Sequence, residues 1–214
     1  MNSLNHLKKY SLAISFGIYV LITFFLAYRP TLFDFLTGGD LYFMDWAHKA
    51  VSHPEILIEK YCSHYPAEET MFYRPNLYAE LFLGYKVWKA NGLCFRLVNM
   101  ITELLCGLML GLVIVALSQQ KSTKQTDSLS HYKTILWALF AAAFFVLYPS
   151  HSESVNWVSV VTNPLITFFF LTAFWFYIQW RTRSKQSFFI LSIVATILAF
   201  LTKETALAQA KLFV

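Results

Sequence analysis

The sequence predicts an all-α integral membrane protein with about five transmembrane helices and a long first loop. Hydrophobic residues make up 57% of the 214 residues, whereas soluble domains are about 45–50% apolar. Charged residues make up only 14%, against about 25% in soluble domains. The apolar residues are also gathered into separate long runs. Because backbone groups inside lipid must pair within their own segment, each run is expected to be a helix.

Five apolar runs follow one another along the chain: Tyr10–Tyr28, Leu97–Leu117, Thr134–Tyr148, Leu165–Trp180 and Phe188–Leu201. A helix needs about 20 residues to cross a bilayer, within a range of about 17–25. The first two runs are long enough. The third and fifth are short, so they must recruit flanking polar residues or end part-way. Arg29-Pro30 follows the first run in place of a small-residue cleavage site, which favours an uncleaved signal anchor.

The basic residues predict how these helices are oriented. Lys8 and Lys9 precede the first run, and the connectors at 118–133 and 181–187 are rich in Lys and Arg. The connector at 149–164 has neither. Short basic connectors stay in the cytoplasm, so we expect a cytoplasmic N-terminus. The first loop (29–96), the 149–164 connector and the end of the chain (202–214) are then extracytoplasmic. The net charge of +5 is explained by topology, and no nucleic-acid partner is expected.

The first loop is expected to contain helices at the membrane interface. Within Asn76–Lys89, five apolar residues recur at helical spacing: Tyr78, Leu81, Phe82, Tyr85 and Trp88. Glu80 and Lys86 point elsewhere. Such a helix suits the headgroup region of the bilayer. The alternative is a helix of the soluble type that packs on the rest of the loop. Cys62 and Cys94 flank this part of the loop, either as a disulfide or as two thiols.

The stretch Tyr148–Pro164 is a polar patch between two apolar runs, and it is the first candidate site. It contains His151 and Glu153 as titratable groups. Polar residues at membrane depth are costly unless they line water or a site. We therefore expect this stretch to form the lip of an active site. The alternative for Glu153 is a carboxylate at a helix N-terminus, where the helix dipole stabilises it.

Two acids of the first loop are candidate bases. Asp40 and Asp45 come just after the Gly38-Gly39 turn, close to the end of the first helix. A partly desolvated carboxylate has a raised pKa, which suits a general base acting on an acceptor hydroxyl or amine. The alternative for each is a solvated loop acid.

Five further residues are candidate substrate-binding groups. Arg74 follows two aromatic residues and suits a lipid phosphate, or else is an aromatic-stacked anchor. Asn99 and Glu103 share one face of the second helix, as site residues or as partners in interhelical hydrogen bonds. Lys203 and Glu204 close the fifth run, as a phosphate-binding pair or as ordinary interfacial charge.

Four short motifs together resemble one family. Tyr148–Val158 resembles the His-Pro-x-His-x-Glu-Ser/Ala-Val-Ala-Trp signature of the transmembrane-plus-tetratricopeptide O-mannosyltransferases and their bacterial relatives, which belong to the GT-C superfamily. Tyr73–Pro75 resembles their Tyr-Arg-Pro motif, and Phe95–Asn99 their Phe/His-x-Leu-Val-Asn. Thr202–Ala206 resembles their Ala/Ser-Lys-Glu-Thr-Ala. Two residues depart from the family pattern. Tyr148 stands where the signature has a His, and Gly39 stands where the first acid of an acidic pair would be expected.

The resemblance implies a partial GT-C fold and transfer of a sugar from a polyprenyl-phosphate donor to a protein or glycan acceptor at the extracytoplasmic face. It implies a catalytic acid in the first loop, where Asp40 matches. We assign Asp40, Asp45 and Glu153 as catalytic. The donor-binding set is Arg74, Asn99, Glu103, His151, Lys203 and Glu204. The resemblance covers only the N-terminal portion of these enzymes, so a truncated form is expected. No cofactor and no metal ligand set are assigned, and a requirement for a divalent metal stays open.

Two other functions are compatible with the same residues. In a membrane transport or scaffold protein, Glu103, Glu153 and Glu204 would line a polar path. In an inactive remnant of the enzyme, neither a donor lipid nor a partner would bind.

Overall fold

The computed structural model describes residues 2–34, 36, 38–62, 73–121 and 128–206. Every regular element in these residues is helical, which confirms the all-α class. The α-helices are α1 (Asn2–Leu32), α2 (Gly39–Ser52), α3 (Glu55–Cys62), α4 (Pro75–Trp88), α5 (Gly92–Lys121), α6 (Ser128–Val146), α7 (Ser152–Asn156), α8 (Thr162–Arg183) and α9 (Gln186–Phe200). Two short 3₁₀ helices, η1 (Pro149–His151) and η2 (Val158–Val161), flank α7.

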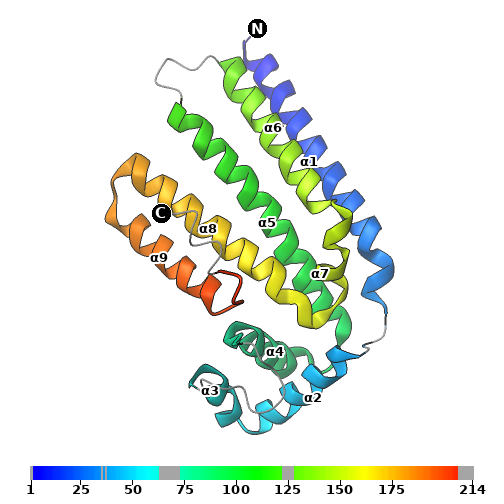
Figure 1. The fold of residues 1–214 in the computed structure, drawn as a ribbon. Coiled ribbons are helices and arrows are strands. Elements are labelled where there is room, and N and C mark those ends of the chain that lie inside the picture. The colour runs from blue at the N-terminus through cyan, green and yellow to red at the C-terminus, as the bar shows by residue number, and fades with distance from the viewer. Residues whose placement is uncertain (1, 35, 37, 63–72, 122–127, 207–214) are drawn as a thin grey trace.

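The five long helices form a bundle with a cap of short helices at one end (Figure 1). In the bundle α1 packs on α6, α6 on α5, α5 on α8 and α8 on α9. The helices α2, α3 and α4 gather at the end opposite the N-terminus, where α7 also lies. The first loop and the central polar stretch are therefore neighbours, although the two long helices α5 and α6 separate them in the sequence.

All five predicted apolar runs lie in the long helices, and two to three of these helices are suited to crossing a membrane. The segments Gly92–Gln120 and Val158–Arg183 are long and apolar enough by themselves. Tyr132–Val146 and Pro149–Asn156 qualify as one span with a bend of 50°. Gly17–Leu32 and Gln186–Phe200 are shorter apolar helices. The five-span topology and the orientation of the chain stay predictions.

Small residues let α5 and α6 approach each other closely. A Cβ atom on Gly107 would overlap the side chain of Val146. A Cβ on Gly111 would lie 3.6 Å from the carbonyl oxygen of Ala138. The close contact that the spacing of these glycines predicts is therefore present, and it is made with α6.

The first loop folds around its own apolar core. Trp46 and Ala47 of α2 pack with Tyr78 and Leu81 of α4, and Val158 of η2 joins them. The predicted helix over Asn76–Lys89 exists as α4, but its aromatic face is turned inward against α2. This helix packs on the rest of the loop, and its placement at a membrane interface stays a prediction. The thiols of Cys62 and Cys94 are free.

Candidate functional site

The central polar stretch interrupts the helical path between α6 and α8. Tyr148 is extended, with ψ 124°, because a residue that precedes proline avoids the helical region. Trp157 is extended in the same way, with ψ 124°, and separates α7 from η2. Val155 before the second break, and Val158 and Val161 after it, are fully buried. The chain therefore turns back into the protein and leaves backbone groups that need partners.

Two buried side chains of α5 supply partners for those groups. Asn99 donates its side-chain Nδ2–H to the carbonyl oxygen of Trp157 at 2.9 Å. Arg96 donates from Nε to the carbonyl oxygen of Asn156 at 3.0 Å and from Nη1 to that of Asp34 at 2.6 Å. Asn99 thus makes the interhelical hydrogen bond that was its alternative role. Arg96 lies inside the Phe95–Asn99 motif, but nothing in the sequence indicates that its side chain joins α5 to the residues after α1 and to the central stretch.

Asp40 holds the other side of the break. Its carboxylate accepts the backbone N–H groups of Val158 at 3.3 Å and Ser159 at 3.1 Å. The residue is 3% exposed. A carboxylate in this position stabilises the start of η2, as side-chain oxygens do at helix N-termini. The geometry makes Asp40 an anchor between α2 and the central stretch, and it does not expose the carboxylate that the predicted general base would need.

Asp45, the second predicted base, lies on the surface of α2. Its carboxylate is 2.6 Å from the ammonium of Lys49 one turn later, and both side chains are more than half exposed. This is the arrangement of a solvated acid, the alternative expected from the sequence, and an exposed pair of this kind contributes little stability.

A polar cluster forms where the first loop, the central stretch and the end of α9 meet. Arg74 donates from Nε to Glu204 Oε2 at 3.0 Å and from Nη2 to Oε1 at 2.6 Å. Lys203 donates to Asn163 Oδ1 at 2.6 Å. Glu153 is exposed and close enough for its charge to act on Lys203. We call Arg74, Glu153, Asn163, Lys203 and Glu204 the polar cluster. Four of its members were predicted site residues, and Asn163 was not.

The charges of the polar cluster shift two pKa values. Burial, and next the nearby guanidinium of Arg74, lower the pKa of Lys203, while Glu204 and Glu153 oppose that shift. The hydrogen bonds from Arg74 hold the pKa of Glu204 below its ordinary value. Lys203 is therefore a cation in surroundings that disfavour its charge, and an additional anion near it would offset that effect.

Asn76 explains why Arg74 reaches Glu204. Its backbone N–H donates to the carbonyl oxygen of Leu201 at 3.0 Å. Its side-chain amide donates to the carbonyl oxygen of Leu198 and to the hydroxyl of Thr202, each at 2.9 Å. The first turn of α4 is thus attached to the last turn of α9. Arg74 comes two residues before Asn76 and is therefore held near the end of α9, where Glu204 lies.

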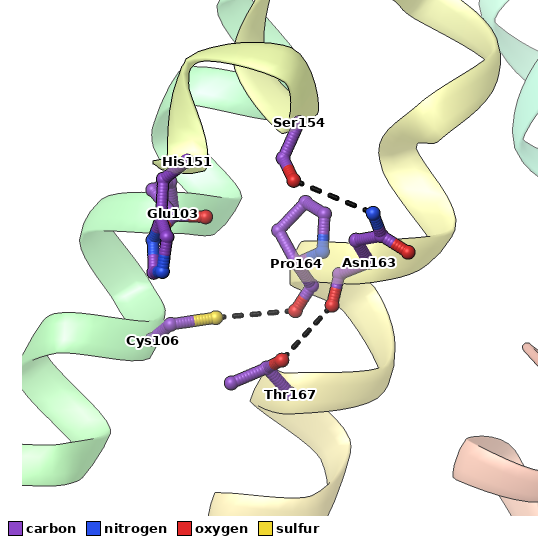
Figure 2. Close-up of polar contacts among 7 residues, drawn as sticks. All are labelled: Glu103, Cys106, His151, Ser154, Asn163, Pro164 and Thr167. Carbon is purple, nitrogen blue, oxygen red and sulfur yellow. Dashed lines mark hydrogen bonds and ion pairs between the residues drawn. The ribbon is translucent and has the colours of Figure 1, made fainter. Parts of the chain in front are cut away.

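A second polar pair lies deeper, between α5 and η1. His151 Nδ1 and Glu103 Oε1 are in direct contact, and the two side chains lie side by side in Figure 2. The side chain of Glu103 is 3% exposed and that of His151 is 25% exposed. Phe145 packs edge-on against the imidazole. Glu103 therefore fixes the orientation of His151, and this contact joins α5 to the central stretch.

Asn163 also makes contacts with α7 and within α8 (Figure 2). Its Nδ2 group lies 3.5 Å from the hydroxyl of Ser154, and its carbonyl oxygen accepts the hydroxyl of Thr167 at 3.0 Å. The next carbonyl, that of Pro164, accepts the thiol of Cys106 at 3.1 Å. A polar residue just before a proline at a helix start was the signal that could have identified Asn163.

The described residues contain no group of three or more His, Cys, Asp or Glu side chains that could hold a metal ion. The polar cluster offers two cations and two carboxylates, which suits an anionic group held by Arg74 and Lys203 beside an exposed acid.

The chain was also compared with protein-family models, with curated proteins and with solved structures, and no match was found in any of the three.

Proposed function

We propose that the chain is a membrane glycosyltransferase, or the N-terminal portion of one, that transfers a sugar from a polyprenyl-phosphate donor to an acceptor at the extracytoplasmic face. The observation that carries this proposal is the polar cluster. Lys203 donates to Asn163 of the central stretch, and the charges of Glu153 of that stretch and of Arg74 of the first loop act on it. These are the segments that carry the family-like motifs.

In this proposal Lys203 and Arg74 hold the phosphate of the donor. An ammonium has three N–H groups, so Lys203 can contact a phosphate oxygen while it keeps its hydrogen bond to Asn163. Burial and Arg74 both destabilise the positive charge of Lys203. A phosphate placed here offsets both effects, which favours binding at this point over binding at a solvated lysine.

Glu153 is the proposed general base, because it is exposed and its charge acts on Lys203, whereas Asp40 is buried. It accepts the proton of the acceptor hydroxyl as that oxygen forms a bond to the anomeric carbon. The bond between that carbon and the phosphate oxygen breaks, and the phosphate leaves with the electron pair. The sugar is transferred with inversion, and the leaving phosphate needs no strong acid.

The test is transfer from a labelled polyprenyl-phosphate sugar in membranes that contain the protein. General base catalysis contributes about 10²–10⁴-fold, so Glu153→Gln is expected to lower transfer by at least about 100-fold. Asp45→Asn is the matched control, since it neutralises an exposed acid that forms an ion pair with Lys49 on the surface of α2. Equal rates in Glu153→Gln and the wild type would remove Glu153 from the mechanism. Absence of transfer by the wild type would contradict the proposal that the protein is a glycosyltransferase.

The pair of Glu103 and His151 favours a second candidate, a membrane transport protein. A buried carboxylate that contacts an imidazole on a membrane-length helix suits the passage of protons or of a cation. In proteoliposomes this candidate predicts a flux that Glu103→Gln abolishes, with no transfer of sugar.

A further inference from the structure

A groove of about 380 Å³ lies between α4 and the facing ends of α5, α8 and α9. Its walls are mostly apolar: Leu83, Val87, Val98, Leu165, Phe169 and Leu198 line it. Asn76 and Glu80 are also at its edge. The groove lies on the face of α4 opposite its packing against α2, and two of its walls come from the membrane-length helices α5 and α8.

Glu80 is a carboxylic acid in a groove whose other lining residues are uncharged. Its Oε2 atom has essentially no solvent-accessible surface and no hydrogen-bond partner in the described part of the chain. None of the other residues that line the groove is titratable or charged. Burial raises the pKa of Glu80 from 4.5 to about 8, with no charged group contributing to the shift. One oxygen of the carboxyl group therefore has no hydrogen-bond partner among the described residues, and the groove that Glu80 lines is otherwise uncharged.

We propose that the groove binds an aminophospholipid, with the lipid ammonium on the carboxylate of Glu80 and one acyl chain along the apolar wall. The occupant must supply what the groove lacks, which is a cation that donates hydrogen bonds, and it must cover the apolar wall. A buried acid with no partner is costly, and an ammonium that pairs with it removes that cost.

The ethanolamine headgroup fits these requirements better than the other common headgroups. Its primary ammonium has three N–H donors for the Glu80 oxygens. The quaternary ammonium of choline has no N–H, so it cannot donate a hydrogen bond to the carboxylate. A phosphatidylglycerol headgroup brings no cation to the carboxyl group. When the ethanolamine lipid binds, the carboxylic acid becomes a carboxylate and one proton passes to water.

The protonation state of Glu80 is the readout. A hydrophobic carbodiimide adds to a protonated carboxyl group in an apolar site and leaves a stable N-acylurea that peptide mass spectrometry detects. The whole chain is placed at pH 7 in nanodiscs of phosphatidylcholine, phosphatidylglycerol or phosphatidylethanolamine. We expect labelling of Glu80 in the first two lipids and loss of labelling in the third. Equal labelling in all three, or labelling in none, would overturn the proposal.

A second measurement follows the lipid itself. The protein is extracted from mixed-lipid membranes, and retained lipids are identified by native mass spectrometry. Retained phosphatidylethanolamine is expected for the wild type and for Glu59→Gln, an exposed position on α3. It is expected to be lost in Glu80→Gln, which removes an unpartnered acid and so should fold. Equal retention in Glu80→Gln, or preferential retention of phosphatidylglycerol, would contradict the proposal. Neither measurement depends on sugar transfer, so this proposal and the proposed function can fail independently.

Discussion

Arg74 and Glu204 are 130 residues apart in the sequence and form a two-point ion pair, with contacts of 3.0 and 2.6 Å. The pair joins the part of the first loop just before α4 to the residues that follow α9. Both nitrogens face the two carboxylate oxygens in parallel, which is the strongest and most directional geometry for such a pair. A lysine cannot reproduce this geometry because its ammonium is a single point of contact.

Arg74→Lys is therefore expected to lower stability although it keeps the charge. The side chain of Glu204 is 38% exposed, so screening by solvent limits the loss in the free energy of unfolding to about 1 kcal/mol or less. Thermal unfolding in detergent measures the change. Arg181→Lys, at the exposed end of α8, is the control and should have no effect. A wild-type melting temperature in Arg74→Lys would show that the second contact is not needed.

The same pair predicts a dependence of stability on pH. Arg74 holds the pKa of Glu204 below its ordinary value of 4.5. The unfolded chain then takes up this proton before the folded protein does. The stabilisation is present above about pH 4.5 and is lost as the pH falls through the folded pKa. The wild type should exceed Glu204→Gln in stability at pH 7 and approach it in acid. A constant difference down to pH 3 would be inconsistent with this.

Asp40 has a structural role that substitution can separate from catalysis. In Asp40→Ala, the backbone N–H groups of Val158 and Ser159 lose their acceptor. Leaving buried donors unsatisfied costs about 1–3 kcal/mol each. Asn keeps one oxygen acceptor, so Asp40→Asn should be closer to the wild type in stability. Chemical unfolding measures both variants.

The transfer assay completes the test of Asp40. If Asp40 acts as an anchor, Asp40→Asn retains transfer in proportion to the folded protein that remains. A stably folded Asp40→Asn protein without any transfer would return Asp40 to the role of base.

The contact between α5 and α6 should not tolerate a larger residue at Gly107. A Cβ there overlaps Val146, and overpacking of this kind costs about 1–3 kcal/mol. Gly111→Ala is the matched control on the same helix face, because its Cβ would make ordinary contacts at 3.6 and 3.9 Å. Thermal unfolding in detergent should rank Gly107→Ala well below Gly111→Ala. Equal melting temperatures would mean that the two helices separate without cost.

Glu80→Gln is expected to stabilise the lipid-free protein in detergent above about pH 4.5. The pKa of Glu80 is about 8 in the folded protein against an ordinary 4.5. Between these values the folded state binds the extra proton, so wild-type stability falls as the pH rises and levels off above about 8. Glutamine has no such dependence. The advantage of the variant should reach about 1–3 kcal/mol at pH 8 and vanish at pH 4. A pH-independent difference would contradict the raised pKa.

The helices of the bundle could be predicted from the sequence, because long apolar runs leave the backbone few alternatives to a helix. The close contact at Gly107 was predictable for the same kind of reason, since small residues four apart form one face. The short helices α2 and α3 were not predicted. Their apolar residues, such as Trp46 and Ala47, are matched to the surface of α4, and such a match becomes visible only when both helices are placed.

The roles of the polar residues were harder to predict than the helices. The sequence identified Asp40 and Arg74 as important, but a carboxylate is a base or an anchor according to what it faces. Two backbone N–H groups 118 and 119 residues further along decide this for Asp40. Glu80 looked like a solvent-facing residue of an amphipathic helix because its position on the helix says nothing of the neighbouring helices. Asn163 was missed since it has no charge.

Asn76 gives the groove and the polar cluster a shared wall. One face of this residue forms the edge of the groove, while its amide attaches α4 to the last turn of α9. A molecule that fills the groove would therefore contact the same residue whose side chain attaches α4, and with it Arg74, to the end of α9.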